Sequence, residues 1–219
     1  MITVKLLRQK TEDRRQKTKG DKMKDKTLNY YNENAKEYFD ATFSIDMTDL
    51  YKGFLDNMIK GGRILDLGCG SGRDSLYFKN NGYLVTAVDG CEQLAKEAEE
   101  LISEKVIVST FEDLKLEEKY DGIWACASLL HVNRDKIISL LRKLSNNLKE
   151  SAVFYISFKY GENEYIDNKG RYFNCYTEDS FIDTIKGIKE LKIKSIYKSG
   201  DTLKGRDSLL WLNILLEKE

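Results

Sequence analysis

Three glycines at alternate positions interrupt the apolar run ILDLGCGSG at residues 64–72. The aliphatic residues predict a buried strand, and Gly68, Gly70 and Gly72 predict a tight turn in which a ligand can contact the backbone. A helix that begins after such a turn attracts negative charge to its N-terminus. The dinucleotide fingerprint G-x-G-x-x-G is not met, because Arg73 stands where its third glycine is required, and no G-K-[ST] follows. We therefore expect a ligand without a pyrophosphate.

Two acidic residues lie at the ends of neighbouring predicted strands. Asp66 precedes Gly68 by two residues, and Asp89 ends the apolar run YLVTAVDG, 17 residues after Gly72. A carboxylate at the end of the second strand is placed to hold the hydroxyls of a ribose. A ribose on Asp89 and a charged amino-acid group near Asp66 describe S-adenosylmethionine (SAM). Asp66 would face the ammonium group of SAM directly or through water.

The elements that must position these residues follow from the apolar pattern. Short apolar runs alternate with helical periods from residue 63, which implies parallel strands joined by right-handed crossovers in a doubly wound α/β sheet. After residue 160 the pattern changes, and two late strands joined by a glycine-containing turn predict an antiparallel edge. The predicted strands are 63–69, 83–88, 105–110, 121–127, 152–158, 191–198 and 208–216; the predicted helices are 73–81, 91–102, 134–148 and 177–187, with a loop at 161–176.

The first 60 residues divide into two parts. Residues 1–26 hold ten basic and four acidic residues, a formal charge of +6, and we interpret them as a basic flexible extension. This extension is either a solvated tail or an arm that binds nucleic acid. Residues 27–219 form the predicted main domain, in which 27–60 are a helical cap. Its aromatic stripe either packs on the core or lines a pocket, and contains Tyr30, Tyr31, Ala35, Tyr38 and Phe39.

The overall composition excludes several classes of protein. Lys and Arg number 36 and Asp and Glu number 36 among 219 residues, so the net charge favours no class of partner. The four cysteines form no C-x-x-C pair and predict neither a disulfide framework nor a metal site. We find no signal-peptide pattern and no apolar run of roughly 20 residues that could cross a bilayer. These features predict a soluble cytoplasmic protein with no membrane partner.

A few side chains outside the glycine turn could contribute chemistry. His131 is the single histidine and is either a general base or a structural residue that bonds the backbone. Lys159 and Arg171 fall near the predicted loop after the fifth strand, where they either bind an anionic substrate group or face solvent. Cys126 is not expected to act as the nucleophile of cytosine methylation, because the chain has no proline and that chemistry places the cysteine after one.

Four segments together resemble the class I SAM-dependent methyltransferases: ILDLGCGSG, VTAVDGC, FEDL and YDGIWACASLLHV, within residues 28–160. The resemblance implies a Rossmann-like sheet of about seven strands, mostly parallel with an antiparallel last strand. It implies that the turn from Gly68 through Cys69 to Gly72 contacts the cofactor and that Asp89 holds both ribose hydroxyls. The other implied contacts are Gly90 and Cys91 near the adenosine, Phe111, Glu112 and Asp113 at the adenine, Ala125 near the methionine portion, and Ser128 to His131 beside the substrate.

The segments YYNENAKEYFDAT and SLLHV resemble the small-molecule branch of that family, which includes tellurite-resistance-like proteins. In that branch the N-terminal helix closes over the cofactor, which implies that Tyr30 and Tyr38 contact it. The resemblance does not decide whether Glu112 or Asp113 meets the adenine amino group.

We therefore expect an enzyme that transfers a methyl group from SAM to a small-molecule acceptor and leaves S-adenosylhomocysteine (SAH). Methyl transfer from a sulfonium can proceed by positioning and desolvation, so no catalytic residue is assigned. The alternatives are an RNA or tRNA methyltransferase that uses the basic extension and a SAM-binding protein without catalysis. The sequence does not predict an oligomeric state.

Overall fold

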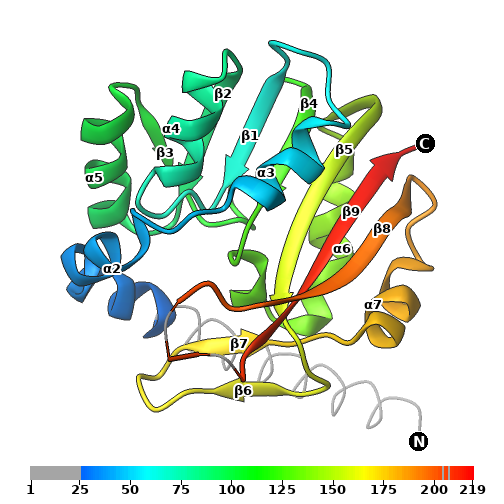
Figure 1. The fold of residues 1–219 in the computed structure, drawn as a ribbon. Helices are drawn as coiled ribbons and strands as arrows, with labels where there is room; N and C mark the ends of the chain where they lie inside the picture. Colours follow the sequence, from blue (N-terminus) through cyan, green and yellow to red (C-terminus); the bar gives the residue numbers. More distant parts are fainter. Residues whose placement is uncertain (1–25, 204, 207) are drawn as a thin grey trace, which may run out of the picture.

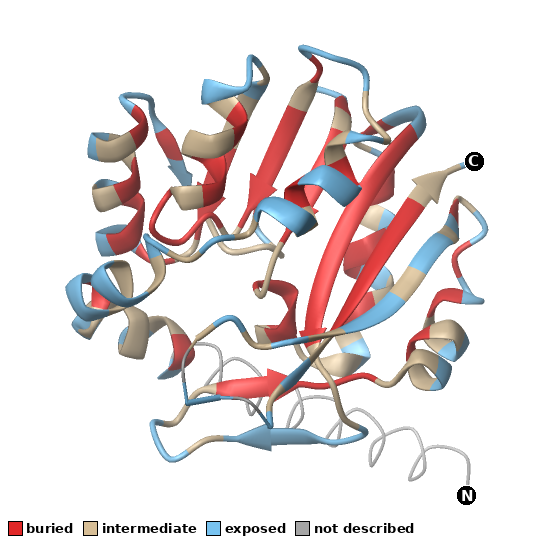
Figure 2. Cartoon of the chain, in the orientation of Figure 1, coloured by how far each residue is buried: buried red, intermediate tan, exposed pale blue. Residues whose placement is uncertain are grey.

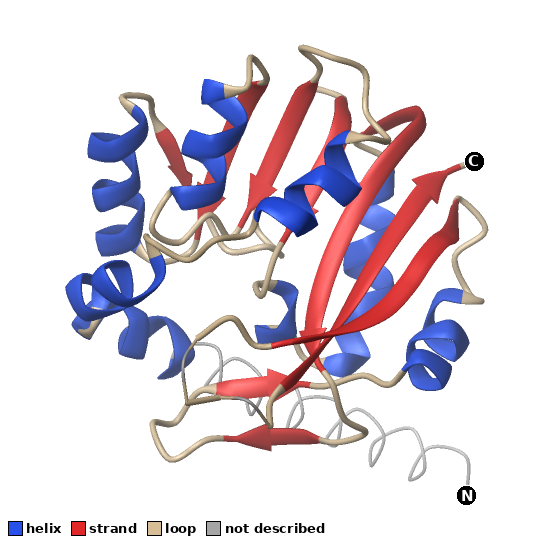
Figure 3. Ribbon diagram, viewed as in Figure 1, coloured by secondary structure: helices blue, strands red, loops and turns tan. Residues whose placement is uncertain are grey.

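The computed structural model describes residues 26–203, 205–206 and 208–219. The predicted basic extension, residues 1–26, lies outside the described residues except for its last member. Within the described part, a central sheet is flanked by helices on both faces (Figures 1 and 3).

The central sheet has seven strands in the order β3-β2-β1-β4-β5-β9-β8 (Figure 1). The pairs from β3 to β5 are parallel, and β9 is antiparallel to both β5 and β8. The predicted Rossmann-like α/β sheet with an antiparallel last strand is therefore confirmed, although β9 lies inside the sheet and β8 forms the edge. The strands are β1 Arg63–Leu67, β2 Leu84–Asp89, β3 Val106–Val108, β4 Tyr120–Ala125, β5 Leu148–Lys159, β8 Leu191–Gly200 and β9 Leu210–Lys218.

Alternate residues of a strand point to opposite faces of the sheet. Apolar residues on both faces are therefore covered by helices. Ile64 of β1 packs in a cluster with side chains of α3 and α4, whereas Leu65 packs in a cluster with side chains of α6 and α7. The central strands are buried on both faces, as Figure 2 shows. The helices are α2 Ala35–Thr42, α3 Thr48–Leu55, α4 Arg73–Asn80, α5 Glu92–Ile102, α6 Arg134–Ser145 and α7 Glu178–Ile185, with a 3-10 turn η1 Leu129–His131; residues 26–33 are also helical.

Helix α6 shows how local sequence sets these boundaries. The Asn133 side chain accepts the N–H of Asp135, which caps the helix at its N-terminus. Ile137, Leu141 and Leu144 recur at helical spacing and are fully buried. The helix ends earlier than the predicted residue 148, because Leu148 pairs with Tyr120 at the start of β5.

The predicted loop at 161–176 contains a hairpin that sequence analysis missed. Strand β6 Glu164–Ile166 pairs with β7 Tyr172–Asn174 in antiparallel register. Each strand has three residues, too few for alternation to predict it. Gly170 takes a φ of +82° in the turn between them. The N–H of Tyr172 donates to the Thr27 hydroxyl at 3.1 Å, so the hairpin contacts the first described helix.

The cap helix α3 is held to the sheet by a buried aromatic cluster around one carboxylate. Asp74 accepts hydrogen bonds from the Tyr51 hydroxyl at 2.5 Å and the Trp124 indole at 2.8 Å, and it pairs with Arg73 at 2.6 Å. The Trp124 ring stacks on that of Tyr155 at 4.0 Å. A buried carboxylate with three donors is satisfied, so α3 is fixed against β4 and β5.

Candidate functional site

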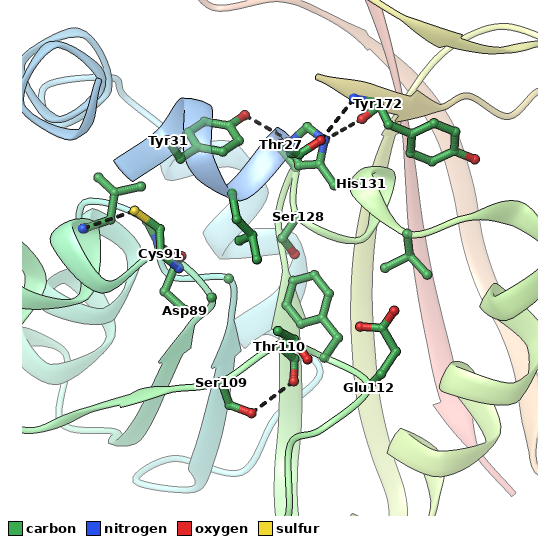
Figure 4. A pocket seen from close by; sticks show the side chains of 18 of the residues that line it. Thr27, Tyr31, Asp89, Cys91, Ser109, Thr110, Glu112, Ser128, His131 and Tyr172 are labelled. Atoms are coloured by element: carbon green, nitrogen blue, oxygen red, sulfur yellow. Dashed lines mark hydrogen bonds between the residues drawn. The ribbon is translucent and has the colours of Figure 1, made fainter. Parts of the chain in front are cut away.

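A first cavity opens at the carboxyl ends of β1, β2 and β4, which is where parallel α/β sheets bind ligands. Figure 4 shows how its walls combine the first described helix, the glycine turn, the loop after β3 and the segment after β4. Of the residues predicted from sequence, those that line it are Tyr38, Gly68, Gly70, Asp89, Gly90, Cys91, Phe111, Glu112, Ser128 and His131.

The three glycines of the turn meet different neighbours. A Cβ at Gly68 would lie 2.4 Å from the Ser128 Cβ, and one at Gly72 would lie 3.0 Å from the Ala98 Cβ of α5. Gly68 and Gly72 are therefore required by packing of the protein on itself. A Cβ at Gly70 would lie 3.3 Å from the Tyr38 ring, at the cavity wall. Gly70 is thus the glycine at which an added side chain would meet the cavity wall at Tyr38.

Asp89 ends β2 with its carboxylate in the first cavity. One oxygen accepts the N–H of Gly70 at 2.8 Å, and the other accepts the N–H of Cys91 at 2.7 Å. Burial raises the pKa of Asp89, and these backbone hydrogen bonds oppose the rise. An ionised carboxylate has about four acceptor positions. Each oxygen therefore keeps capacity for a further donor such as a ribose hydroxyl.

Asp66 of β1 and Cys69 of the glycine turn are buried and line neither the first nor the second cavity. The Ser75 hydroxyl of α4 donates to Asp66 at 2.6 Å. Burial, with the nearby charge of Asp74, raises the pKa of Asp66. Cys69 packs with α5 side chains, and Gly72 is also outside both cavities. Asp66 therefore lies outside the walls of both cavities, and its predicted contact with an ammonium group, direct or through water, stays a prediction.

The loop after β3 contains Glu112 and Asp113, the two alternatives that the sequence leaves open for the contact with the adenine amino group. Glu112 lines the first cavity, whereas Asp113 does not, and the Asp113 carboxylate accepts a hydrogen bond from the Thr110 hydroxyl at 2.6 Å. Lys136 lies 3.5 Å from Glu112 at the cavity wall. Phe111 lines the same wall. Of the two residues, Glu112 is therefore the one that lines the first cavity.

The segment after β4 turns sharply at the cavity. Ala125 is fully buried and lines neither cavity, whereas Ala127 lines both. The predicted backbone contact of Ala125 with the cofactor stays a prediction. Ala127 has a φ of +51°, and its N–H donates to the Ser157 hydroxyl at 2.8 Å. The Ser128 hydroxyl donates to the Leu67 carbonyl at 2.6 Å, which ties this segment to β1.

His131 joins the cap to the β6–β7 hairpin. Its Nδ1 lies 2.6 Å from the Tyr172 carbonyl oxygen and its Nε2 lies 3.0 Å from the Tyr31 hydroxyl. Because a carbonyl only accepts, Nδ1 carries the proton and Nε2 accepts from Tyr31. Burial lowers the pKa of His131 to about 4, so the ring is neutral at pH 7. Both ring nitrogens are occupied, which favours the structural alternative over the general base.

The predicted cap tyrosines lie on two helices, Tyr30 and Tyr31 on the first described helix and Tyr38 on α2. Tyr38 lines both cavities, as does Tyr31, which sequence analysis placed in the aromatic stripe without assigning it to the site. The Tyr31 and Tyr38 rings meet edge to face at 5.2 Å. Tyr30 lines neither cavity; its hydroxyl lies 3.0 Å from the Lys169 ammonium.

A second cavity of about 360 Å³ adjoins the first. Lys159 and Arg171, both predicted from sequence, line it. So do Trp211 and Asn213 of β9, a strand that is otherwise largely apolar. The two cavities share four lining residues, which define a junction between them: Tyr31, Tyr38, Ala127 and His131.

The described residues hold no cluster of three or more His, Cys, Asp or Glu side chains that could bind a metal ion. No helix among them is long and apolar enough to span a membrane.

Solved structures share this fold. A Burkholderia thailandensis 1,6-didemethyltoxoflavin-N1-methyltransferase, solved with 1,6-didemethyltoxoflavin and SAH, superposes with a TM-score of 0.71 and 19% identity, covering 89% of this chain and 86% of that chain. TehB from Haemophilus influenzae superposes with a TM-score of 0.65 and 19% identity, covering 87% of this chain and 67% of that chain. The fold is that of the class I SAM-dependent methyltransferases.

The family follows from sequence comparison. The profile of the family described as "Tellurite resistance protein TehB" matches residues 30–156, more than half of the chain. A "Probable S-adenosyl-L-methionine-dependent methyltransferase TehB" from Haemophilus influenzae strain 10810 is 30% identical over 128 residues, which are 55% of this chain and 44% of that protein. The chain belongs to the TehB family, and it spans less than half the length of this curated relative.

Proposed function

We propose that this chain transfers a methyl group from SAM to a small-molecule acceptor. The observation that carries the proposal is the junction at which two cavities meet, lined by Tyr31, Tyr38, Ala127 and His131. A methyl transfer needs a cofactor and an acceptor in separate compartments that meet at the reacting atoms. The first cavity would hold the cofactor and the second the acceptor.

The residues of the first cavity fit the cofactor. Asp89 would accept the ribose hydroxyls with the capacity that its two backbone hydrogen bonds leave. Glu112 would accept from the adenine amino group beside Phe111, and Gly70 would let the cofactor approach the backbone. The first cavity encloses about 110 Å³, less than a typical site for a drug-sized ligand, so the cofactor would extend into the junction.

The junction is suited to a cationic cofactor. When bound, SAM supplies an electrophilic methyl group on a sulfonium. Burial keeps Tyr31 protonated by raising its pKa to about 12, and it keeps His131 neutral at pH 7. Neither side chain would repel the sulfonium. Tyr31 and Tyr38, packed edge to face, would also exclude water from the reacting atoms.

The small-molecule class is supported by the volume of the second cavity, which suits a small organic ligand, and by the Burkholderia structure, which was solved with 1,6-didemethyltoxoflavin and SAH bound. The RNA alternative depends on residues 1–25, which lie outside the described residues. Labelled SAM should be incubated with separate metabolite and RNA fractions, with the full chain and with a chain that lacks residues 1–25. Transfer to metabolites by both chains supports the proposal, whereas transfer only to RNA, lost on deletion, supports the alternative. SAM binding without transfer to either fraction supports a non-catalytic protein.

Cofactor binding is tested by calorimetric titration with SAM, with NADH as a control. We expect SAM to bind and NADH not to bind. Asp89→Ala should weaken SAM binding at least tenfold, or about 1.4 kcal/mol, because the ribose hydroxyls lose a charged acceptor. Asp183→Ala, an exposed aspartate of α7 paired with Lys186, is the matched control and should leave the affinity unchanged. Equal affinities of wild type and Asp89→Ala would contradict the assignment.

A further inference from the structure

The floor of the second cavity is one face of the sheet. Ser157 of β5 pairs directly with Asn213 of β9, and Lys159 pairs directly with Trp211. Directly opposed residues of antiparallel strands project from the same face and contact each other. All four line the second cavity. The floor therefore presents the polar pair Ser157–Asn213 beside the pair Lys159–Trp211, which combines a cation with an indole ring.

The cations that line this cavity differ in their partners. Among the described residues, Lys159 has no carboxylate within ion-pair distance; its ammonium lies 2.8 Å from the Tyr165 hydroxyl and 3.5 Å from the centre of the Phe173 ring. The other lining cations each pair with a carboxylate: Arg73 with Asp74 at 2.6 Å, Arg171 with Asp167 at 2.7 Å and Arg206 with Asp201 at 3.9 Å.

The acidic residues of the cavity leave Lys159 uncompensated. Asp201 accepts the Trp211 indole N–H at 3.0 Å and the Leu203 N–H at 2.7 Å. Asp46 and Asp49 are exposed. Lys159 is half-buried, and burial lowers its pKa. A half-buried cation with no carboxylate within ion-pair distance loses part of its solvation, so an anion that binds here would recover interactions that the protein alone does not supply.

The remaining walls are suited to a flat molecule. Trp211, Phe173 and Tyr31 present aromatic side chains to the cavity, whose 360 Å³ lies within the usual range for organic ligands. Rings stack or meet edge to face on such side chains. A small inorganic oxyanion would use the Lys159 charge and leave these surfaces without contacts.

We propose that the methyl acceptor is a planar organic anion, an aromatic or heteroaromatic carboxylate, whose charge binds Lys159 and whose ring contacts Trp211 and Phe173. This inference rests on the proposed function for its role as an acceptor. The binding preference itself is a property of the second cavity and can be measured without catalysis.

The test uses 2-naphthoate and its neutral analogue 2-naphthamide, titrated calorimetrically into the full chain with and without SAH. We expect 2-naphthoate to bind at least roughly tenfold more tightly, as hydrogen bonds to charged groups allow. Lys159→Met keeps the aliphatic stem and should abolish the preference. The matched control is Lys192→Met. Lys192 is an exposed lysine near the start of β8, whereas the second cavity lies at the end of that strand, so this variant should retain the preference for 2-naphthoate. Thermal melting establishes that both variants are folded.

Equal affinity of the wild type for the two compounds, or binding of neither, would overturn the inference whether or not the variants fold. So would a carboxylate preference that survives in Lys159→Met. Tellurite that binds the wild type in a Lys159-dependent manner, with no binding of 2-naphthoate, would replace the organic class by an inorganic oxyanion. Failure of SAH to bind would count against the proposed function alone, because the comparison of naphthoate with naphthamide still reports on Lys159.

Discussion

Replacement of Gly68 by alanine should destabilise the protein more than replacement of Gly82, although both glycines have nearly the same positive φ angle. Their φ angles are +82° and +84°. An added Cβ at Gly68 would lie 2.4 Å from the Ser128 Cβ, whereas nothing lies within 4 Å of one at Gly82. Both variants carry the cost of a left-handed non-glycine residue, about 1–2 kcal/mol. Gly68→Ala adds overpacking, about 1–3 kcal/mol.

The assay is equilibrium unfolding in urea, followed by circular dichroism. We expect the free energy of unfolding to fall by about 1–2 kcal/mol in Gly82→Ala and by about 2–5 kcal/mol in Gly68→Ala. The difference between the variants isolates the contact of the glycine turn with the segment after β4. Equal losses would refute the reasoning that Gly68 is required by this contact.

Two further predictions concern the ionisable groups of the first cavity. Because the pKa of His131 falls from 6.5 to about 4 on folding, the unfolded chain binds more protons between these values, and stability is lost as pH falls from about 6.5 to 4. Protonation of His131 should account for a loss of up to about 3 kcal/mol in the free energy of unfolding. In His131→Gln this part of the pH dependence should be absent from the unfolding curves. An identical pH dependence of stability in wild type and variant would show that His131 is not its cause. Glu112→Ala should weaken SAM binding about tenfold by removing a charged acceptor, and Asp113→Ala by less than about threefold; titration that found the reverse order would move the adenine contact to Asp113.

The sheet and the glycine turn could be predicted because their signals are local. The alternation of apolar runs with helical periods gave the strands to within a few residues for most of the sheet, and Asp89 was found because it ends one of them. The β6–β7 hairpin was missed because its strands have three residues each. Helix α6 was predicted too long because β5 begins at Leu148.

The site residues that sequence missed depend on contacts between distant segments. Tyr31 and Tyr30 are neighbours on one helix, and only the packing of that helix decides that Tyr31 meets His131 while Tyr30 meets Lys169. Trp211 lies in an apolar strand, and its place in the second cavity follows from its pairing with Lys159.

Two residues that sequence assigned to the ligand also take part in the packing of the protein. Gly72 has the type and spacing of a ligand-contacting glycine, but its missing side chain accommodates Ala98 of α5. Ala125 lies at the end of β4, yet it is fully buried.

A crystal structure of the full chain with SAH tests the central claim most directly, because it places the ribose and the sulfur relative to named residues. We expect the ribose hydroxyls within hydrogen-bond distance of the Asp89 carboxylate. We expect the sulfur at the junction of Tyr31, Tyr38, Ala127 and His131, facing the second cavity. SAH bound away from Asp89, or with its sulfur separated from the second cavity by these four residues, would contradict the central claim.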